Sequence, residues 1–215
     1  MAKVKEAGVL ELTGLDSLGE VVVRAHQQVR GGRPLLVAID GRSGSGKTTL
    51  TAELATWLSK RGIAAEVFHL EGLYQGWSGL AQAALVWQQL AEAVADGRAN
   101  SPETAPHWFG WDWGSSQTTG PHPFTAAQQA AGGVLIAEGV GALTGTHDVG
   151  VFVELDTARR RQRALARDGE TYRPYWDMWA EQEADLLAAY ASAYAGRASA
   201  MFSGRSYFFI SATSH

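Results

Sequence analysis

The chain has 215 residues, 46% of them hydrophobic and 19% charged, which is enough for one globular domain with a full core. Its net charge of −4 gives no general attraction to nucleic acid or to an anionic membrane, so we expect neither as a partner. The absence of cysteine excludes disulfides, thiolate metal sites and cysteine nucleophiles.

The sequence predicts a cytoplasmic protein, and its first helix is expected within the first 32 residues. The N-terminal residues lack the apolar stretch of a signal peptide, and no apolar run in the chain is long enough to span a bilayer. Apolar residues recur at helical spacing from Leu15 to Val29, and Gly31 ends the pattern.

An apolar strand at residues 35–40 runs directly into a glycine-rich loop. The segment from Gly41 to Thr48 fits the P-loop pattern G-x-x-x-x-G-K-[ST] at every fixed position, and a helix-forming stretch follows. Such a loop surrounds an anion with backbone N–H groups, and the helix N-terminus adds its positive dipole end. We expect Lys47 to reach the β- and γ-phosphates of ATP, and the Thr48 hydroxyl to hold Mg²⁺. The residues expected to bind ATP are Gly41, Ser43, Gly44, Ser45, Gly46, Lys47, Thr48 and Thr49.

Strands and helices alternate along the rest of the chain. Further strands are expected at residues 64–70, 134–138, 149–155 and 206–211, and helices at about 80–96, 124–131, 157–173 and 174–196. Residues 99–123 contain four prolines and no usable periodicity, which is typical of a functional or mobile loop. Because this alternation implies a parallel sheet covered on both faces, we predict an α/β, three-layer P-loop NTPase fold. It would have about five parallel strands in a single domain spanning residues 1–215.

Glu138 ends one of these strands, at residues 134–138. Ligands of open α/β sheets bind at the carboxyl ends of the strands, so this carboxylate is expected beside the P-loop. We predict that Glu138 holds Mg²⁺ through water, together with Thr48. A carboxylate that only pairs with a neighbouring side chain is the alternative.

Three motifs are informative together: the form of the loop from Gly41 to Thr49, Glu71-Gly72-Leu73-Tyr74 after the second strand, and the arginine-rich helix from Thr157. They resemble the uridine kinase and phosphoribulokinase-like branch of the P-loop kinases, which carry Asp-x-Phe-Tyr in the second place and a lid in the third. The resemblance implies an ATP- and Mg²⁺-dependent phosphotransferase that moves the γ-phosphate to a hydroxyl of a small, nucleoside-like acceptor. It places the acceptor side at about residues 71–125 and the lid at about 157–173.

The same resemblance assigns roles to two residues after the second strand. Glu71 would act as general base on the acceptor hydroxyl, and Tyr74 would belong to the acceptor site. A carboxylate that faces the γ-phosphate can accept a hydroxyl proton during in-line transfer. A Glu71 that ligates Mg²⁺ or caps a turn is the other interpretation.

Trp111-Asp112-Trp113 resembles the Tyr-Asp-Phe element of uridine kinases, whose aromatic residue lines the nucleoside pocket. The histidine that follows in that family is absent here, where residues 114–116 are Gly-Ser-Ser. We expect Trp111 and Asp112 to contact a planar acceptor that need not be uridine. Tryptophan that simply packs at the edge of the core is the alternative.

Three arginines of the predicted lid share one helix face. Arg160, Arg163 and Arg167 are spaced i, i+3 and i+7. Guanidinium groups on a lid can neutralise the transferring phosphoryl group, so Arg163 and Arg167 are expected to be catalytic and Arg160 to bind substrate. The alternative is a solvated face whose arginines pair with nearby acidic residues.

Two other functions stay open. A nucleoside monophosphate kinase of the cytidylate type is favoured by Ala38-Ile39-Asp40-Gly41, but Arg98 is the only Lys or Arg between Tyr74 and Thr125 to hold an acceptor phosphate. An ATP-binding protein without catalysis is the second alternative. A guanine-specific switch is excluded, because Asn100 is the only asparagine and no Asn-Lys-x-Asp motif exists. The sequence does not predict an oligomeric state.

Overall fold

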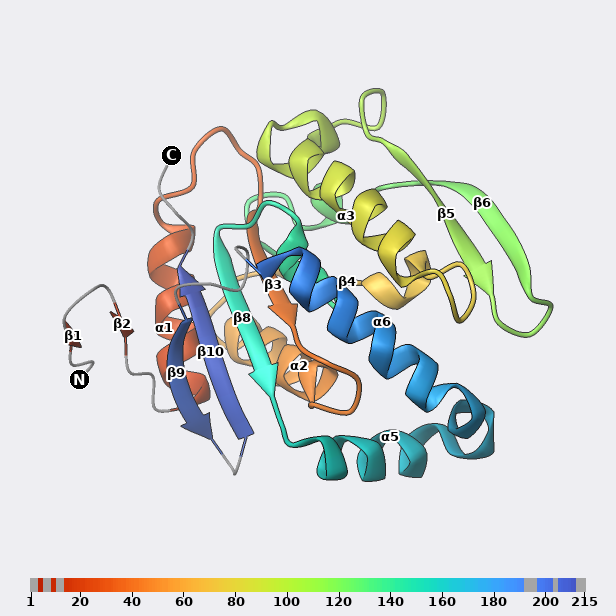
Figure 1. Cartoon of the computed structure of the whole chain (residues 1–215). Coiled ribbons are helices and arrows are strands. Elements are labelled where there is room, and N and C mark those ends of the chain that lie inside the picture. The colour runs from red at the N-terminus through yellow and green to blue at the C-terminus, as the bar shows by residue number, and fades with distance from the viewer. Residues whose placement is uncertain (1–3, 6–8, 11–13, 192–196, 203–204, 212–215) are drawn as a thin grey trace.

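The centre of the molecule is a six-stranded sheet with the order β4-β7-β3-β8-β10-β9 (Figure 1). The computed structural model describes residues 4–5, 9–10, 14–191, 197–202 and 205–211. The strands of this sheet are β4 (Ala65–His69), β7 (Val134–Glu138), β3 (Leu35–Asp40), β8 (Val149–Glu154), β10 (Arg205–Ser211) and β9 (Arg197–Phe202). The first four run parallel, and β10 pairs antiparallel with both β8 and β9.

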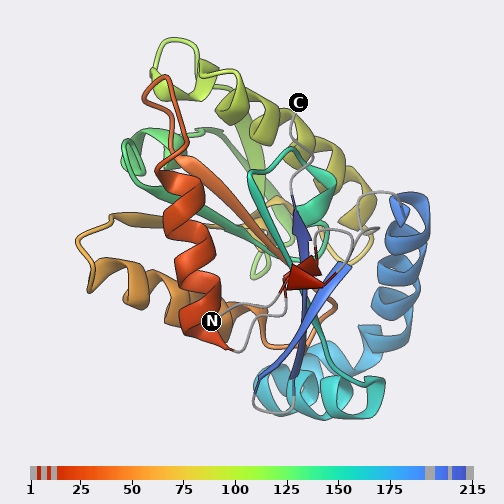
Figure 2. The ribbon, with the colours of Figure 1, turned by 90° about the vertical axis from the view of Figure 1, so that its left-hand side faces the viewer.

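Helices cover both faces of the sheet, as Figure 2 shows from the side. One layer contains α1 (Leu15–His26) and α2 (Lys47–Ser59); the other contains α3 (Leu80–Ala95), α4 (Ala126–Gln129) and α6 (Trp176–Ala189). The helix α5 (Thr157–Tyr172) follows β8 at the carboxyl end of the parallel strands. None of the helices in the described ranges is long and apolar enough to cross a membrane.

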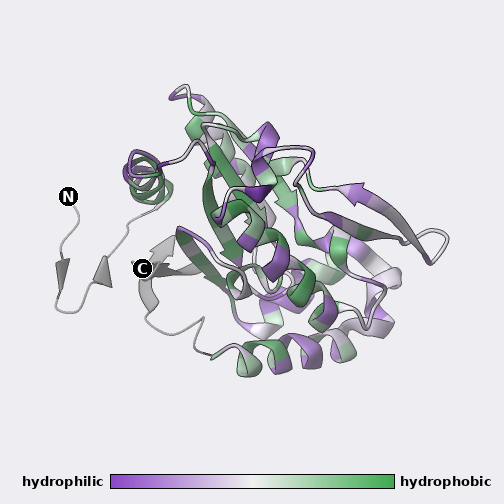
Figure 3. Ribbon diagram, turned by 90° about the horizontal axis from the view of Figure 1, so that it is seen from above, coloured by the Kyte–Doolittle hydropathy of each residue, from purple (hydrophilic) through white to green (hydrophobic). Residues whose placement is uncertain are grey.

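Short elements connect these layers. The 3₁₀ turns are η1 (Leu70–Leu73), η2 (Arg98–Asn100), η3 (Ala142–Thr144) and η4 (Arg173–Tyr175). A hairpin of β5 (His107–Asp112) and β6 (Gln117–Pro123) projects from the body of the molecule (Figures 1 and 3). Near the N-terminus, β1 (Val4–Lys5) pairs with β2 (Val9–Leu10).

The continuous apolar run of β3 reflects burial on both faces of the sheet. Leu35, Val37 and Ile39 pack in the cluster that contains α1 and α2, whereas Leu36 and Ala38 pack in the cluster that contains α3 and α6. Successive side chains of a strand point to opposite faces, so a strand buried on both sides is apolar throughout. This burial fixes the end of β3, and therefore the start of the glycine-rich loop.

The predicted α/β, three-layer fold is confirmed, with differences in three places. Residues 99–123 are not an irregular loop, because most of this stretch forms the β5–β6 hairpin. The tail strand is present as β10 but runs antiparallel, so the sheet has four parallel strands rather than five. The helix expected at 174–196 begins at Trp176 and ends at Ala189, and residues 192–196 lie outside the described part of the chain.

The predicted lid is interrupted near its end. Gly169 has φ +59° and ψ −137°, which breaks the helical path of α5 three residues before its last residue, Tyr172. The turn η4 then leads into α6. Since glycine adopts positive φ at little cost, this position allows the chain to change direction between the two helices.

Candidate active site

The glycine-rich loop lies between β3 and α2, at the carboxyl end of the sheet. A Cβ on Gly41 would stand 2.3 Å from the Val153 carbonyl oxygen, and one on Gly44 would stand 2.2 Å from that of Arg160. Only glycine therefore permits the loop to lie this close to β8 and α5. The Ser45 hydroxyl inside the loop is buried and has no hydrogen-bond partner among the described residues. Ser45 is not among the residues that line either cavity at the loop, so its expected contact with phosphate stays a prediction.

Two cavities meet at the start of α2. One, which we name the phosphate-side cavity for the phosphate expected there, is lined by Gly44, Gly46, Lys47, Thr48, Thr49, Arg163, Ala164 and Arg167. The other, which we name the acceptor-side cavity for the acceptor expected there, has a volume of about 360 Å³. It extends from the same loop towards Glu71, Tyr74 and aromatic residues of α5 and α6. Gly44, Lys47, Thr48 and Arg167 line both cavities. A phosphoryl group bound at these four residues would be accessible from both cavities.

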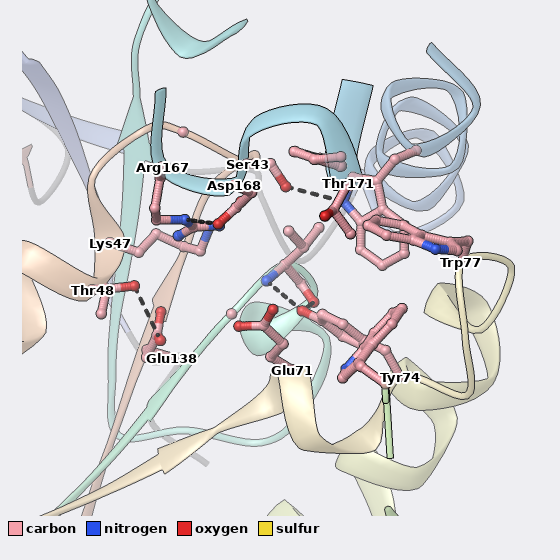
Figure 4. Close-up of a pocket in the computed structure, with 16 residues that line it drawn as sticks. Ser43, Lys47, Thr48, Glu71, Tyr74, Trp77, Glu138, Arg167, Asp168 and Thr171 are labelled. Atoms are coloured by element: carbon pink, nitrogen blue, oxygen red, sulfur yellow. Dashed lines mark hydrogen bonds and ion pairs between the residues drawn. The ribbon is translucent and has the colours of Figure 1, made fainter. Parts of the chain in front are cut away.

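Lys47 lines both cavities, and Figure 4 shows its side chain among those of the acceptor-side cavity. Its side chain is 9% exposed, and its Nζ donates to the Arg42 carbonyl oxygen at 3.4 Å. The ammonium group is thus held against the loop rather than extended into solvent. A positive charge at this place can act on phosphate oxygens from either cavity.

Thr48 and Glu138 face each other across the floor of the site (Figure 4). The Thr48 hydroxyl donates to a Glu138 carboxylate oxygen at 3.3 Å, and His69 Nδ1 lies 2.7 Å from the same oxygen. His69 and Glu138 are register partners on β4 and β7, which explains why their side chains meet. A hydroxyl and a carboxylate are hard oxygen ligands, so this pair fits the coordination that Mg²⁺ prefers. The sequence analysis did not identify His69.

Glu71 and Tyr74, which follow β4, also line the acceptor-side cavity. Glu71 is exposed on η1 and lines the acceptor-side cavity. Tyr74 is buried, and its hydroxyl donates to the Val140 carbonyl and accepts from the Val140 N–H. Burial, and then the negative charges of Asp40, Glu138 and Glu71, raise the pKa of Tyr74 well above its usual value. The phenol therefore stays neutral and fixes the loop after β7 beside the cavity.

Aromatic rings from four segments form the rest of the acceptor side. Trp77 stacks on Tyr175, with ring centroids 4.3 Å apart, and on Tyr172 at 5.4 Å. It also meets Trp113 edge-on at 5.0 Å and Trp179 at 6.2 Å. We call Trp77, Trp113, Tyr172 and Trp179 the aromatic wall; all four line the cavity, and the sequence analysis assigned none of them to the site.

The structure places the two hairpin residues expected to bind substrate away from this cavity. Asp112 is exposed and accepts from the Gly114 N–H and the Ser115 hydroxyl, which holds the hairpin turn. Trp111 packs over Gly76, and neither residue is among those that line the cavity. Trp113, two residues further along, lines it instead.

The three arginines of the predicted lid face do not line the same cavity. Arg163 lines the phosphate-side cavity, and Arg167 lines both cavities. Arg167 makes a bidentate pair with Asp168, and this hydrogen bonding raises the pKa of its guanidinium. Arg160 is only 2% exposed and donates to the carbonyl oxygens of Leu155 and Ser43. Its side chain therefore supports the glycine-rich loop through Ser43.

Comparison with known structures shows the class of fold. A protein from Silicibacter sp. TM1040 called a "putative fructose transport system kinase" shares it, with 20% identity, a TM-score of 0.51, and coverage of 73% of this chain and 82% of that chain. A "possible uridine kinase" from Bacillus stearothermophilus is 18% identical, with a TM-score of 0.45 over 80% of this chain and 92% of that chain. No protein-family model and no curated protein sequence matches the chain. The likeness to the first structure shows that this chain and that protein share an α/β fold.

Proposed function

We propose that the chain is an ATP-dependent phosphotransferase that moves the γ-phosphate to a hydroxyl of a small, nucleoside-like acceptor. The observation that supports this best is the meeting of two cavities at Gly44, Lys47, Thr48 and Arg167. One cavity follows the glycine-rich loop and α2, where a triphosphate would lie. The other is bounded by a carboxylate and aromatic rings, where an acceptor would lie.

In this mechanism Glu71 accepts the proton of the acceptor hydroxyl as its oxygen attacks the γ-phosphorus. The bond between the γ-phosphorus and the bridging oxygen breaks, and ADP leaves with the electron pair of that bond. Lys47, Arg163 and Arg167 balance the negative charge of the transferring group and of ADP. Thr48 and Glu138 would hold Mg²⁺, which when bound neutralises phosphate charge.

The acceptor is proposed to be uncharged or at least not anionic. Among the described residues that line the acceptor-side cavity, Lys47 and Arg167 are the only Lys or Arg side chains, and both lie at the phosphate end. Arg98, the one Arg of the acceptor region, is exposed and pairs with Asp96. Arg167 is near enough to act on Tyr172 of the aromatic wall, but no second Lys or Arg of the described lining is there to hold an acceptor phosphate. This argues against the monophosphate kinase alternative. Flat aromatic faces suit a nucleobase or a similar planar group.

Trp111, Asp112 and Arg160 keep a supporting role in this proposal. Trp111 would shape the acceptor side through Gly76, and Asp112 through the hairpin turn that carries Trp113. Arg160 would act on the phosphates through the loop that it supports.

The test is ADP release from MgATP with and without a panel of hydroxyl acceptors that includes nucleosides, nucleoside monophosphates and sugars. We expect at least one uncharged acceptor to raise turnover well above the rate with ATP alone. The monophosphate of that acceptor should raise turnover less. Binding of MgATP without stimulation by any acceptor would instead support an ATP-binding protein that lacks catalysis. Preference for a monophosphate would support the kinase of the cytidylate type.

A further inference from the structure

A buried carboxylate on α6 holds the first half of the glycine-rich loop. Glu183 is 1% exposed; one of its oxygens accepts from the Ser43 N–H at 2.7 Å, and the other from Arg42 Nε at 2.9 Å. Glu183 and Ser43 are 140 residues apart in sequence. Hydrogen bonds to a buried carboxylate are stronger than neutral ones, so this contact fixes two consecutive loop residues.

Neighbouring groups complete the attachment. Arg42 also donates to the Ala180 carbonyl at 2.7 Å, and the Trp179 indole N–H donates to the Ser43 hydroxyl at 3.0 Å. Arg160 approaches from α5, with its guanidinium 3.7 Å from Glu183 and 3.2 Å from the Ser43 carbonyl oxygen. Residues 42 and 43 are therefore bound from two helices at once.

Glu183 is the carboxylate that separates two guanidinium groups. Burial, and then the positive charge of Arg42, lower the pKa of Arg160, and the charge of Glu183 opposes this effect. Without Glu183, Arg42 and Arg160 would repel each other with no counter-charge between them. The loop residue, Arg42, is the more exposed of the two and has more room to move away.

Arg42 and Ser43, which Glu183 holds, are themselves connected to the residues that would touch phosphate. Lys47 Nζ donates to the carbonyl oxygen of Arg42, the residue that Glu183 holds. Gly44 follows Ser43 directly and lies against the Arg160 backbone. A displacement of residues 42 and 43 would therefore change the position of both the lysine and the anion-binding backbone.

We propose that Glu183 is a positioning residue, which holds Arg42 and Ser43 so that Gly44 and Lys47 have the geometry that binds nucleotide. The expected effect of Glu183 on nucleotide affinity rests on the proposed function. The hydrogen bonds by which Glu183 fixes Arg42 and Ser43 do not depend on it. Glu183 lies four residues after Trp179, on the same face of α6. That face therefore contacts both the glycine-rich loop and the acceptor-side cavity.

Hydrogen exchange followed by mass spectrometry tests the hold on the loop without any ligand. In Glu183→Ala we expect the amides of residues 41–47 to exchange about ten- to a hundredfold faster, because hydrogen bonds to a charged group are lost, while β3 and β7 keep their protection. The exchange rates in Glu183→Gln should lie between those of the parent and of Glu183→Ala, because its amide oxygen can still accept from the Ser43 N–H. This variant replaces Glu183→Ala in the test if the alanine variant does not fold. Glu181→Ala, an exposed carboxylate on the same helix, is the matched control and should match the parent.

Titration calorimetry with MgADP then tests the consequence. We expect affinity to fall about ten- to a hundredfold in Glu183→Ala, less in Glu183→Gln and not at all in Glu181→Ala. Unchanged exchange in residues 41–47 would overturn the proposal, as would equal acceleration throughout the core, which indicates global destabilisation. Faster exchange with unchanged MgADP affinity would overturn the link to nucleotide. A parent that does not bind MgADP would contradict the proposed function, and the exchange result would still decide the role of Glu183 in the loop.

Discussion

The Thr48 hydroxyl and the Glu138 carboxylate are joined by a hydrogen bond of 3.3 Å, although 90 residues separate them in sequence. Thr48 is in the first turn of α2, and Glu138 is the last residue of β7. Parallel pairing of β3 with β7 brings the helix start and the strand end to one edge of the sheet. The pair lines the acceptor-side cavity beside Lys47.

Replacement of Glu138 by glutamine should raise the Mg²⁺ concentration needed for half-maximal turnover by about tenfold. The amide keeps the size of the side chain but removes the negative charge that would attract the ion. Turnover measured across a Mg²⁺ titration gives the result. Glu154→Gln is the control, since Glu154 ends β8, which lies on the other side of β3 from β7, but is exposed. An unchanged Mg²⁺ dependence in Glu138→Gln would exclude it from the metal site.

Lys47→Ala should lower acceptor-dependent ADP release by about a thousandfold, because the positive charge at the junction of the two cavities is lost. The fold should survive, since Lys47 lies in the loop–helix junction outside the two apolar clusters. Circular dichroism checks the fold, and Lys60→Ala, at the exposed end of the same helix, serves as the control. Full activity in Lys47→Ala would contradict the assignment of phosphate transfer.

Glu71→Gln should lower kcat by about a hundredfold or more while MgATP affinity changes little, because a general base acts only in the chemical step. Glu71 lies on the wall of the acceptor-side cavity and is not among the residues that line the phosphate-side cavity. Single-turnover rates and MgATP titrations separate the two effects. Equal losses in kcat and affinity would indicate a role in metal or nucleotide binding. Glu92→Gln, exposed on α3, is the control.

The phosphate half of the site could be predicted because its residues are consecutive. One local pattern specifies the strand, the loop from Gly41 to Thr48 and the start of α2, and each part follows from local chemistry. The strands β3 and β7 were also predictable, because burial on both faces leaves an uninterrupted apolar run. His69 could have been found by the same reasoning as Glu138, since both end neighbouring strands.

Glu71 and Tyr74, which the motif after the second strand indicated, line the acceptor-side cavity. The aromatic wall could not be predicted, because its residues meet only in the folded chain. Trp77, Trp113, Tyr172 and Trp179 belong to four separate segments, and at helical spacing an aromatic residue looks like ordinary core. The hairpin was missed for a related reason. Most residues of β5 and β6 are at least partly exposed, so they show no alternation of apolar and polar residues. The direction of β10 depends on its partners β8 and β9, which no local pattern specifies.

Trp77→Ala should raise the KM for the acceptor by up to about tenfold, because a planar acceptor would lose a stacking contact with the indole that contributes about 0.5–1.5 kcal/mol. MgADP affinity should stay close to that of the parent, since Trp77 does not line the phosphate-side cavity. Steady-state kinetics with the best acceptor of the panel gives KM. Phe109→Ala, whose ring is 52% exposed on the hairpin, is the control. A loss confined to kcat, with the acceptor KM unchanged, would argue against the aromatic wall as the acceptor site.

Tyr74 makes the stability of the fold depend on alkaline pH. Its pKa is raised far above the ordinary value of 10, first by burial and then by nearby carboxylates, whereas in the unfolded chain it ionises near 10. Below pH 10 the folded and the unfolded chain both keep the phenolic proton of Tyr74, so its ionisation does not reduce the free energy of unfolding. As the pH rises above about 10, the unfolded state loses the proton and the folded state keeps it, so the free energy of unfolding falls. Burial raises the pKa of Tyr172 in the same direction.

Tyr74→Phe should therefore remove part of this alkaline sensitivity. At neutral pH we expect the variant to be about 1–3 kcal/mol less stable, because the Val140 N–H and carbonyl lose their buried partner. Above about pH 10 its free energy of unfolding should fall less steeply than that of the parent, by up to about 1.4 kcal/mol per pH unit. Urea unfolding at a series of pH values gives both quantities. Parallel loss of stability in the two proteins would mean that Tyr74 ionises in the folded state as readily as in the unfolded chain.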